Sequence, residues 1–201
     1  MIFDGHSDIF SDVRYKREAG ETQVLKNHHL DRLRKGGIGG ACFVIWADTY
    51  NGHAPKDEME AIVKGIKGEM AETKEFVLIH NVEELKAAEA AGKFAILLGI
   101  EGLAGIGEDL SKIDELYDLG ARHAMLTWNE ENALATGVKG DPNRGVTELG
   151  KQAIKKLQEK KMILDVSHIN EKSSGMLSIW RQALFWHLIP MRRHWQAQQE
   201  T

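Results

Sequence analysis

Short apolar runs alternate along this chain with longer charged segments whose apolar residues recur three and four positions apart. A short apolar run is typical of a buried strand, and the three-and-four spacing is typical of a helix with one apolar face. The runs that we predict as strands are Met1 to Asp8, Ile38 to Trp46, Phe94 to Glu101, Ala121 to Trp128 and Met162 to His168. Strands separated by helical segments indicate repeated βα units around a parallel sheet rather than hairpins.

The charged segments between these runs predict the helices. They are Leu30 to Lys35, Lys56 to Lys74, Val82 to Ala91, Leu110 to Leu119 and Thr147 to Lys160. Gly36, Gly92 and Gly120 follow three of them. We expect each of these glycines to end its helix in the left-handed conformation, which glycine adopts without steric cost.

Composition limits the class of protein. With 201 residues, 42% hydrophobic and 28% charged, the chain can bury one sizeable core in one or two soluble domains. Its formal charge of -4 provides no basic field for nucleic acid or an anionic membrane, so a small-molecule partner fits better. No signal-like segment opens the chain and no run approaches the roughly 20 apolar residues of a membrane span, so we expect a cytoplasmic location.

Polar and aromatic residues stand at the carboxyl ends of the predicted strands. They are His6 and Asp8, Glu101, Trp128 and Asn129, and His168. His6 and Asp8 alternate along their strand, so both side chains leave the same face. In a (β/α)8 barrel the active site assembles at this end, because the βα loops converge over the barrel mouth. We therefore expect these side chains to face one pocket.

A metal ion is the partner that this set of side chains indicates. Glu101 follows an uninterrupted apolar strand, where an unpaired charge is costly to bury. Two imidazoles and two carboxylates form a mixed nitrogen and oxygen set that suits zinc, which would lower the pKa of a bound water. Taken singly, His168 fits a structural histidine, Glu101 fits a helix N-cap partner, and the His6 and Asp8 pair fits many barrel hydrolases.

The remaining histidines lack neighbouring carboxylates at ligand spacing. They are His28, His29, His53, His80 and His123, and we expect structural or solvated roles for them. Asp165 precedes His168 by three residues in the same predicted strand and so points to the opposite face. A structural role is therefore expected for Asp165 as well. The single cysteine, Cys42, lies in an apolar run and is expected to be a buried small hydrophobe.

Several longer motifs, in order from residue 1 to about Ser173, resemble the membrane dipeptidase (renal dipeptidase) family of zinc peptidases. The motifs are DGHSD, HLDRLRKGGIGGACFVIW, ILLGIEG, LTWNEENALATG and GVTELGKQAIKKLQEKKMILDVSH. The resemblance implies a (β/α)8 TIM barrel of the metal-dependent hydrolase type with two zinc ions. His6 and Asp8 would hold the first ion, Glu101 would bridge both, and His168 would hold the second.

This family cleaves dipeptides. The resemblance implies that a hydroxide bridging the two zinc ions attacks the peptide carbonyl while one ion polarises its oxygen. Glu101, which would hold both ions, is the catalytic candidate. Many members have a histidine that contacts the substrate carbonyl where this chain has Trp128. Trp128 and the following Asn129 are therefore the candidates for substrate binding.

The last part of the chain departs from the family and from the composition of the rest. All 17 lysines lie at or before Lys172, while the last 28 residues hold three of the five tryptophans and one acidic residue, Glu200. We expect residues 1–173 to form a partial barrel domain of about five βα units. We interpret residues 174–201 as an out-of-frame translation, because codons for them can spell the family's missing Ser-His-Ser when shifted by one base.

Three functions remain open from the sequence. The first is a zinc dipeptidase, whose activity in this chain depends on the missing part of the second zinc site. The second is a non-catalytic metal-binding fragment. The third is another metal-dependent barrel hydrolase, such as an amidohydrolase or a phosphoesterase. An incomplete barrel also leaves an open sheet edge, which favours a homo-oligomer.

Overall fold

The computed structural model describes residues 1–47 and 52–177, and the backbone of residues 185–186. Its larger sheet is parallel, with the strand order β1-β2-β4-β3. The strands are β1 (Ile2–Ser7), β2 (Ile38–Trp46), β3 (Phe76–Leu78) and β4 (Phe94–Glu101). A second parallel sheet consists of β5 (His123–Met125), β6 (Ile163–Asp165) and β7 (Phe185–Trp186), in that order.

A parallel bridge between Leu98 and Ala121 joins the two sheets where the chain enters β5. β4 pairs with β2 along one edge. On its other edge, β4 pairs with β3 at its start and with Ala121, just before β5, further along. The wall of strands is therefore β1-β2-β4-β5-β6-β7. This succession of parallel strands is an incomplete (β/α)8 barrel, and it contains all five strands that the sequence predicts.

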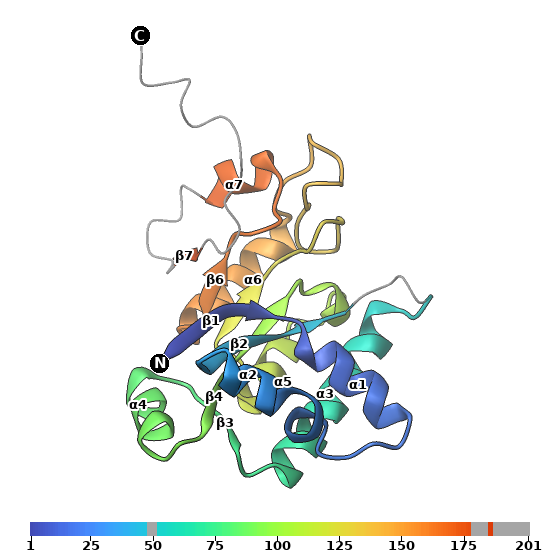
Figure 1. The fold of residues 1–201 in the computed structure, drawn as a ribbon. Helices are drawn as coiled ribbons and strands as arrows, with labels where there is room; N and C mark the ends of the chain where they lie inside the picture. Colours follow the sequence, from blue (N-terminus) through green and yellow to red (C-terminus); the bar gives the residue numbers. More distant parts are fainter. Residues whose placement is uncertain (48–51, 178–184, 187–201) are drawn as a thin grey trace.

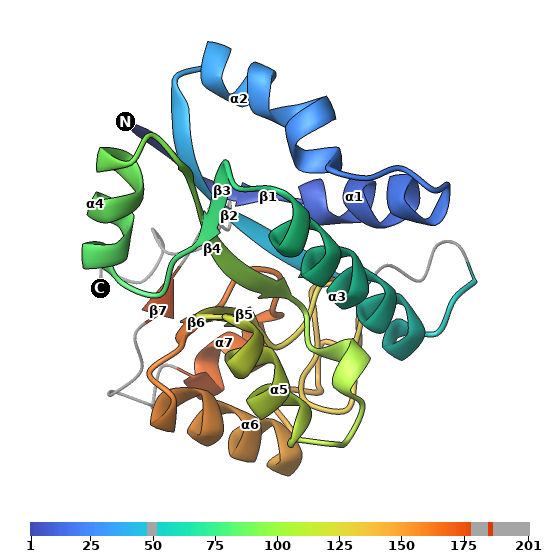
Figure 2. The ribbon, with the colours of Figure 1, turned by 90° about the horizontal axis from the view of Figure 1, so that it is seen from below.

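Helices surround the strands on the outside, as the view in Figure 2 shows. They are α1 (Ile9–Glu18), α2 (Asp31–Lys35), α3 (Pro55–Glu72), α4 (Val82–Ala90), α5 (Lys112–Leu119), α6 (Glu148–Glu159) and α7 (Glu171–Leu177), labelled in Figure 1. A π-helical turn, η1 (Leu25–Leu30), precedes α2, and a 3-10 turn, η2 (Ala104–Ile106), follows β4. Among the described residues, no helix has both the length and the apolarity to cross a membrane.

Local sequence explains where several helices begin. Asn81 and Thr147 are the N-caps of α4 and α6, and their side chains accept hydrogen bonds from the backbone N–H groups of Glu84 and Gly150 at 2.8 and 2.9 Å. α3 begins with Pro55, whose missing N–H costs nothing in the first turn.

The core lies between the sheet and the helices. Phe43 on β2 is fully buried and contacts Phe94 and Phe10, each with ring centroids 5.5 Å apart. Ile62 and Ile66 of α3 are also fully buried, one helical turn apart. Each buried side chain of this size contributes about 1.5–3 kcal/mol through removal from water.

Several elements were missing from the sequence prediction, which gave no segment for α1, β3, α7, β7 or the two turns η1 and η2; α1 and β3 show the reasons. α1 buries Phe10, Val13 and Arg14, and Arg14 pairs with the buried Glu58 of α3 at 3.1 Å. Because Arg14 is charged although it is buried, the buried face of α1 does not show the regular spacing of apolar residues that predicts a helix. β3 has only three residues and so gives too short an alternation to recognise.

Two predicted strands were too long at their carboxyl ends. β5 covers only His123–Met125 of the predicted Ala121 to Trp128, and β6 ends at Asp165 rather than at His168. The Asp165 carboxylate accepts a hydrogen bond from the backbone N–H of Ser167 at 2.8 Å, which turns the chain out of the strand.

The helix stops were predicted correctly at two of three glycines. Gly92 and Gly120 have φ angles of +64° and +121° after α4 and α5. The prediction for Gly36 was wrong, because Gly36 has a φ of -76° and the next residue, Gly37, takes the left-handed conformation at +70°.

Candidate metal centre

The carboxyl ends of three neighbouring strands bring the first candidate ligands together. His6 lies in β1, Asp8 follows the end of β1, and Glu101 is the last residue of β4. β2 lies between them, and its last residue, Trp46, pairs in register with Glu101. Among the described residues, His6, Asp8 and Glu101 are the one group of three whose potential ligand atoms all lie within 4.8 Å of one another.

Glu101 presents its two carboxylate oxygens to two different histidines. Oε2 lies 3.2 Å from His6 Nε2, and Oε1 lies 3.0 Å from His168 Nε2. His6 Nε2 also lies 3.6 Å from Asp8 Oδ1. Glu101 is only 6% exposed, so the cost of burying its charge must be offset by partners of opposite charge.

The spacing and bonding of these atoms fit metal ions. Two ligands at about 2.0–2.2 Å from a tetrahedral zinc lie about 3.3–3.5 Å from each other. The contacts of His6 and His168 with Glu101, at 3.2 and 3.0 Å, are close to this spacing. His168 Nε2 is also buried without a hydrogen bond, and the Asp8 side chain makes no capping bond to α1 although it stands at the N-cap position. These residues therefore form a donor set that suits zinc.

The imidazoles and carboxylates of the site shift one another's pKa values. The nearby carboxylates of Asp8 and then of Glu101 raise the pKa of His6, although burial acts in the opposite direction. Burial raises the pKa of Glu101, but the adjacent His168 and His6 rings outweigh it and bring that pKa well below its usual range. Glu101 is therefore ionised at neutral pH, which is the form in which a carboxylate binds a metal ion.

His168 reaches this centre from a strained loop position after β6. It has a φ of +66°, which is uncommon for a residue other than glycine. Its second ring nitrogen, Nδ1, lies 3.1 Å from the side-chain oxygen of Asn129. The sequence indicated Asn129 for substrate binding, and the structure places its amide oxygen against a candidate metal ligand.

Trp128 lies in the wall of a cavity of about 570 Å³ beside Glu101. Its ring centroid is 5.1 Å from that of Trp46 and 6.1 Å from that of His168. Lys139 also lines the cavity, with its Nζ 5.7 Å from the centroid of Trp128. Trp46 and Lys139 were not predicted from the sequence as site residues. Trp46 could have been identified as a site residue because it is an aromatic residue at the end of β2, in register with Glu101.

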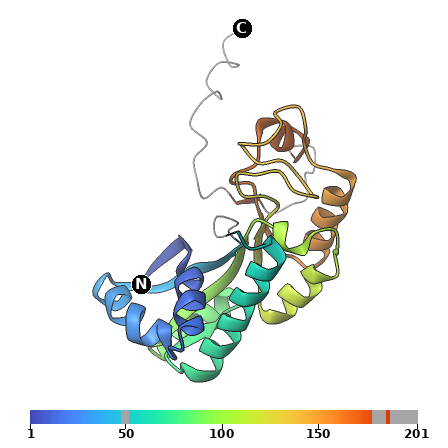
Figure 3. The ribbon, with the colours of Figure 1, turned by 90° about the vertical axis from the view of Figure 1, so that its right-hand side faces the viewer.

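The loop after β5 and the segment leading to α7 lie side by side in Figures 1 and 3. The side-chain amide of Asn170 donates hydrogen bonds to the carbonyls of Asp141 and Arg144, at 3.1 and 2.8 Å. The hydroxyl of Ser173 donates to the carbonyl of Thr136 at 3.2 Å. These bonds join the two segments, which are separated by about thirty residues of sequence, and so hold the chain on either side of Asn129 and His168 together.

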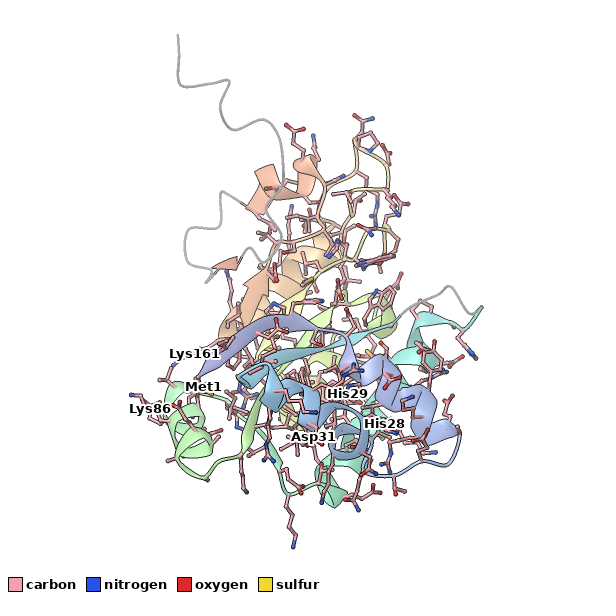
Figure 4. The ribbon with its side chains drawn as sticks, viewed as in Figure 1. Met1, His28, His29, Asp31, Lys86 and Lys161 are labelled. Atoms are coloured by element: carbon pink, nitrogen blue, oxygen red, sulfur yellow. The ribbon has the colours of Figure 1, made fainter. Side chains whose placement is uncertain are left out.

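The other histidines that the structure describes do not belong to the candidate metal group. His28 and His29 lie on η1, near Asp31 in Figure 4, and they pair with Glu21 and Asp12. His80 pairs with Glu84, and His53 is exposed. His123 is buried, with its Nε2 2.9 Å from Asp165 Oδ2.

A larger cavity, of about 710 Å³, lies between α3 and α5 in the helical layer. Its lining combines apolar residues such as Met59 and Leu116 with lysines and acidic residues. None of its lining residues belongs to the candidate metal group, so it contributes no ligand to the centre.

The candidate second metal position has two ligands, Glu101 and His168, among the residues that the structure describes. The two remaining histidines of the chain, His187 and His194, have no spacing in the sequence that indicates a ligand, and they lie outside the described residues.

Comparison with known proteins agrees with the motifs and the fold. The family model for membrane dipeptidase, peptidase family M19, matches residues 1–177. An uncharacterised dipeptidase of Schizosaccharomyces pombe is 27% identical, over 86% of this chain and 47% of its own length.

Two solved structures share the fold. One is the dipeptidase AC, a metallopeptidase of family M19, with a TM-score of 0.76, 21% identity, and coverage of 90% of this chain and 61% of that one. The other is a metallopeptidase from Rhodobacter sphaeroides bound to a phosphinate mimic of the dipeptide L-Ala-D-Ala, with a TM-score of 0.75, 21% identity, and coverage of 90% and 62%. The chain thus spans less than two thirds of the length of each of these relatives. The family match covers most of the chain, and the chain belongs to the membrane dipeptidase family of metallopeptidases.

Proposed function

We propose that this chain carries the metal centre of a zinc-dependent dipeptidase. In this proposal His6 and Asp8 would hold one ion, His168 would hold the second, and Glu101 would contribute to both. The observation that carries it is the arrangement of Glu101, whose two oxygens lie 3.2 and 3.0 Å from two different imidazoles. A carboxylate that faces one ligand on each side has the geometry of a bridge between two metal ions.

When bound, zinc supplies a Lewis acid and lowers the pKa of a water molecule toward neutrality. The protein's own residues provide the surroundings for that chemistry. Glu101 supplies negative charge between the two positions, and Trp46 and Trp128 form an aromatic wall on one side of the cavity. The ammonium group of Lys139, at the same wall, offers a charge complementary to the carboxylate of a dipeptide. The dipeptide mimic bound to the Rhodobacter sphaeroides relative supports this substrate class.

A second candidate is a non-catalytic fragment that binds one ion. Its support is that the described residues contain one group of three close ligands, His6, Asp8 and Glu101, and only Glu101 and His168 for another ion. Zinc stoichiometry separates the two functions. Two tightly bound ions with dipeptide turnover would exclude the fragment, and one ion without turnover would exclude the enzyme. Turnover of phosphoesters or other amides in place of dipeptides would indicate a different barrel hydrolase.

The substitution Glu101→Gln tests the centre directly. It keeps the size of the side chain and removes its charge, so we expect zinc affinity and dipeptide hydrolysis both to fall at least tenfold. Metal content after dialysis, and release of free amino acids from L-Ala-D-Ala, measure the two effects. Glu108→Gln is the matched control, because Glu108 is exposed and lies outside the centre. Unchanged zinc binding in Glu101→Gln would contradict the proposal.

We also propose that residues 1–173 are the in-frame partial barrel domain and that residues 174–201, which include β7, are read out of frame. The composition change after Lys172 supports this division. Sequencing the coding DNA across the Ser173 codon is the test. DNA that cannot encode Ser-His-Ser in the shifted frame would rule out the proposal. The cytoplasmic location and a homo-oligomeric state stay predictions.

A further inference from the structure

Asn129 and Glu101 face opposite nitrogens of the His168 ring. The Asn129 side-chain oxygen lies 3.1 Å from Nδ1, and Glu101 Oε1 lies 3.0 Å from Nε2. In a neutral imidazole only one of the two ring nitrogens carries a hydrogen. A partner that keeps the hydrogen on one ring nitrogen therefore leaves a lone pair on the other. Asn129 is therefore in a position to determine how His168 presents itself to the metal centre.

The bonding of the ring distinguishes the two possible tautomers. An amide oxygen only accepts hydrogen bonds, so Nδ1 must carry the hydrogen if it is bonded to Asn129 Oδ1. With the hydrogen on Nε2 instead, that nitrogen would donate to the carboxylate of Glu101. Nε2 lies 3.0 Å from Oε1 without a well-aligned hydrogen bond. The bond to Asn129 thus favours a hydrogen on Nδ1, which leaves Nε2 as the nitrogen that can offer a lone pair to an ion.

From this geometry we infer that Asn129 is a positioning residue, which holds His168 in the tautomer that directs the Nε2 lone pair at the second metal position. The inference rests on the proposed metal site. It gives Asn129 a role in binding the ion, in place of the contact with substrate that its sequence position indicates. Partners of this kind orient a ligating histidine and raise its basicity.

The backbone around the two residues fixes them relative to each other. The N–H of Lys139 donates to the carbonyl of Asn129 at 2.8 Å, and the N–H of Val138 donates to the carbonyl of His168 at 2.9 Å. One short segment therefore joins the chain after β5 to the chain after β6. This connection also holds His168 at its φ of +66°, so the Asn129 amide is already in place before an ion arrives.

Two substitutions of Asn129 separate positioning from simple packing. Asn129→Leu keeps a similar volume but removes the acceptor, whereas Asn129→Asp keeps an acceptor for the Nδ1 hydrogen. Asn143→Leu is the matched control, because Asn143 is exposed in the same loop. We expect Asn129→Leu to weaken binding of the second zinc about 10-fold to 100-fold, while the first ion binds as before. Asn129→Asp and Asn143→Leu should retain both affinities, measured by competition with a zinc chelator.

A readout that needs neither activity nor a second ion completes the test. In protein labelled with ¹⁵N-histidine, the ring nitrogens of His168, assigned with His168→Gln, report the tautomer with and without zinc. We expect hydrogen on Nδ1 in the unsubstituted protein and in Asn129→Asp, and a mixture of tautomers in Asn129→Leu. Hydrogen on Nε2 in the unsubstituted protein, or the same tautomer in Asn129→Leu, would overturn the inference. Loss of dipeptide turnover alone would instead bear on the proposed function.

Discussion

Asp165 on β6 and His123 on β5 are almost completely buried, and their side chains pair with each other. Their side chains approach to 2.9 Å, and Asp165 also accepts the N–H of Ser167. Burial raises the pKa of Asp165, but the hydrogen bonds from His123 and Ser167 outweigh it and leave the pKa lower than usual. This pair fits the structural role that the sequence indicates for Asp165.

Replacing this carboxylate should destabilise the fold. We expect Asp165→Asn to lower the free energy of unfolding by about 1–3 kcal/mol at pH 7, because His123 keeps a weaker partner in a buried site. Urea denaturation followed by tryptophan fluorescence measures the change. Asp118→Asn, at an exposed position of α5, is the control and should leave the urea midpoint unchanged. An equal midpoint for Asp165→Asn and the unsubstituted protein would contradict the prediction.

The same substitution has an expected pH dependence. Because the pKa of Asp165 is lower in the folded protein than in the unfolded chain, its contribution is present above the unfolded pKa of about 3.9. The contribution is lost as pH falls through the folded pKa. The difference in stability between the unsubstituted protein and Asp165→Asn should therefore be constant from pH 7 to about 5 and shrink below pH 4. A difference in stability that grows as the pH falls would show that folding raises the pKa of Asp165 instead of lowering it.

At the scale of elements, Gly137 is the point where the loop after β5 crosses the chain leaving that strand. A Cβ at this position would meet the carbonyl oxygen of Trp128, and it would lie 2.5 Å from the carbonyl carbon of Asn129. Both contacts are with backbone, which cannot rotate away as a side chain can. A side chain at Gly137 must therefore displace the loop from Trp128 and Asn129.

Gly137→Ala should consequently disturb the metal centre from a position outside it. We expect a loss of stability of about 1–3 kcal/mol, as for other overpacked sites, together with weaker binding at the His168 side of the centre. Thermal unfolding and zinc titration measure the two effects. Gly175→Ala serves as the control, because a Cβ at that helical position meets nothing within 4 Å. Normal stability and zinc binding in Gly137→Ala would show that the loop can move without cost.

The elements that the sequence predicts well are those whose signal is local. The strands β2 and β4 were predicted with the bounds that the structure has, because their apolar runs are uninterrupted and a helix or turn follows each one. The convergence of His6, Asp8 and Glu101 follows from the same reasoning, since parallel strands bring their carboxyl ends to one edge.

Features that depend on distant residues escaped prediction. The π-helical turn η1 begins where the backbone N–H groups of Val24 and Leu25 bind the carboxylate of Glu69, at 3.0 and 2.9 Å. That contact spans more than forty residues of sequence, so no local pattern reveals it. The bond between Asn129 and His168 is hidden in the same way, because it depends on two loop conformations rather than on a strand register.

For the molecule as a whole, the free edge of β1 is the feature with the largest expected effect on behaviour in solution. Among the described strands, β1 pairs only with β2, so its other edge has no strand beside it. Its first residues are apolar and exposed, with Ile2 at 57% and Phe3 at 37%. An exposed apolar edge strand is a template for pairing with another chain.

We therefore expect the protein to self-associate as its concentration rises, and Ile2→Lys to shift it toward the monomer. A lysine at this position places a charge on the strand edge, which must lose its hydration if a second chain pairs there. Light scattering coupled to size-exclusion chromatography, over a hundredfold range of concentration, gives the masses. Val82→Lys is the matched control, because Val82 is exposed to a similar extent, at 56%, but lies at the start of α4. A monomeric unsubstituted protein at every concentration, or an equal effect of the two lysines, would show that the β1 edge does not mediate association.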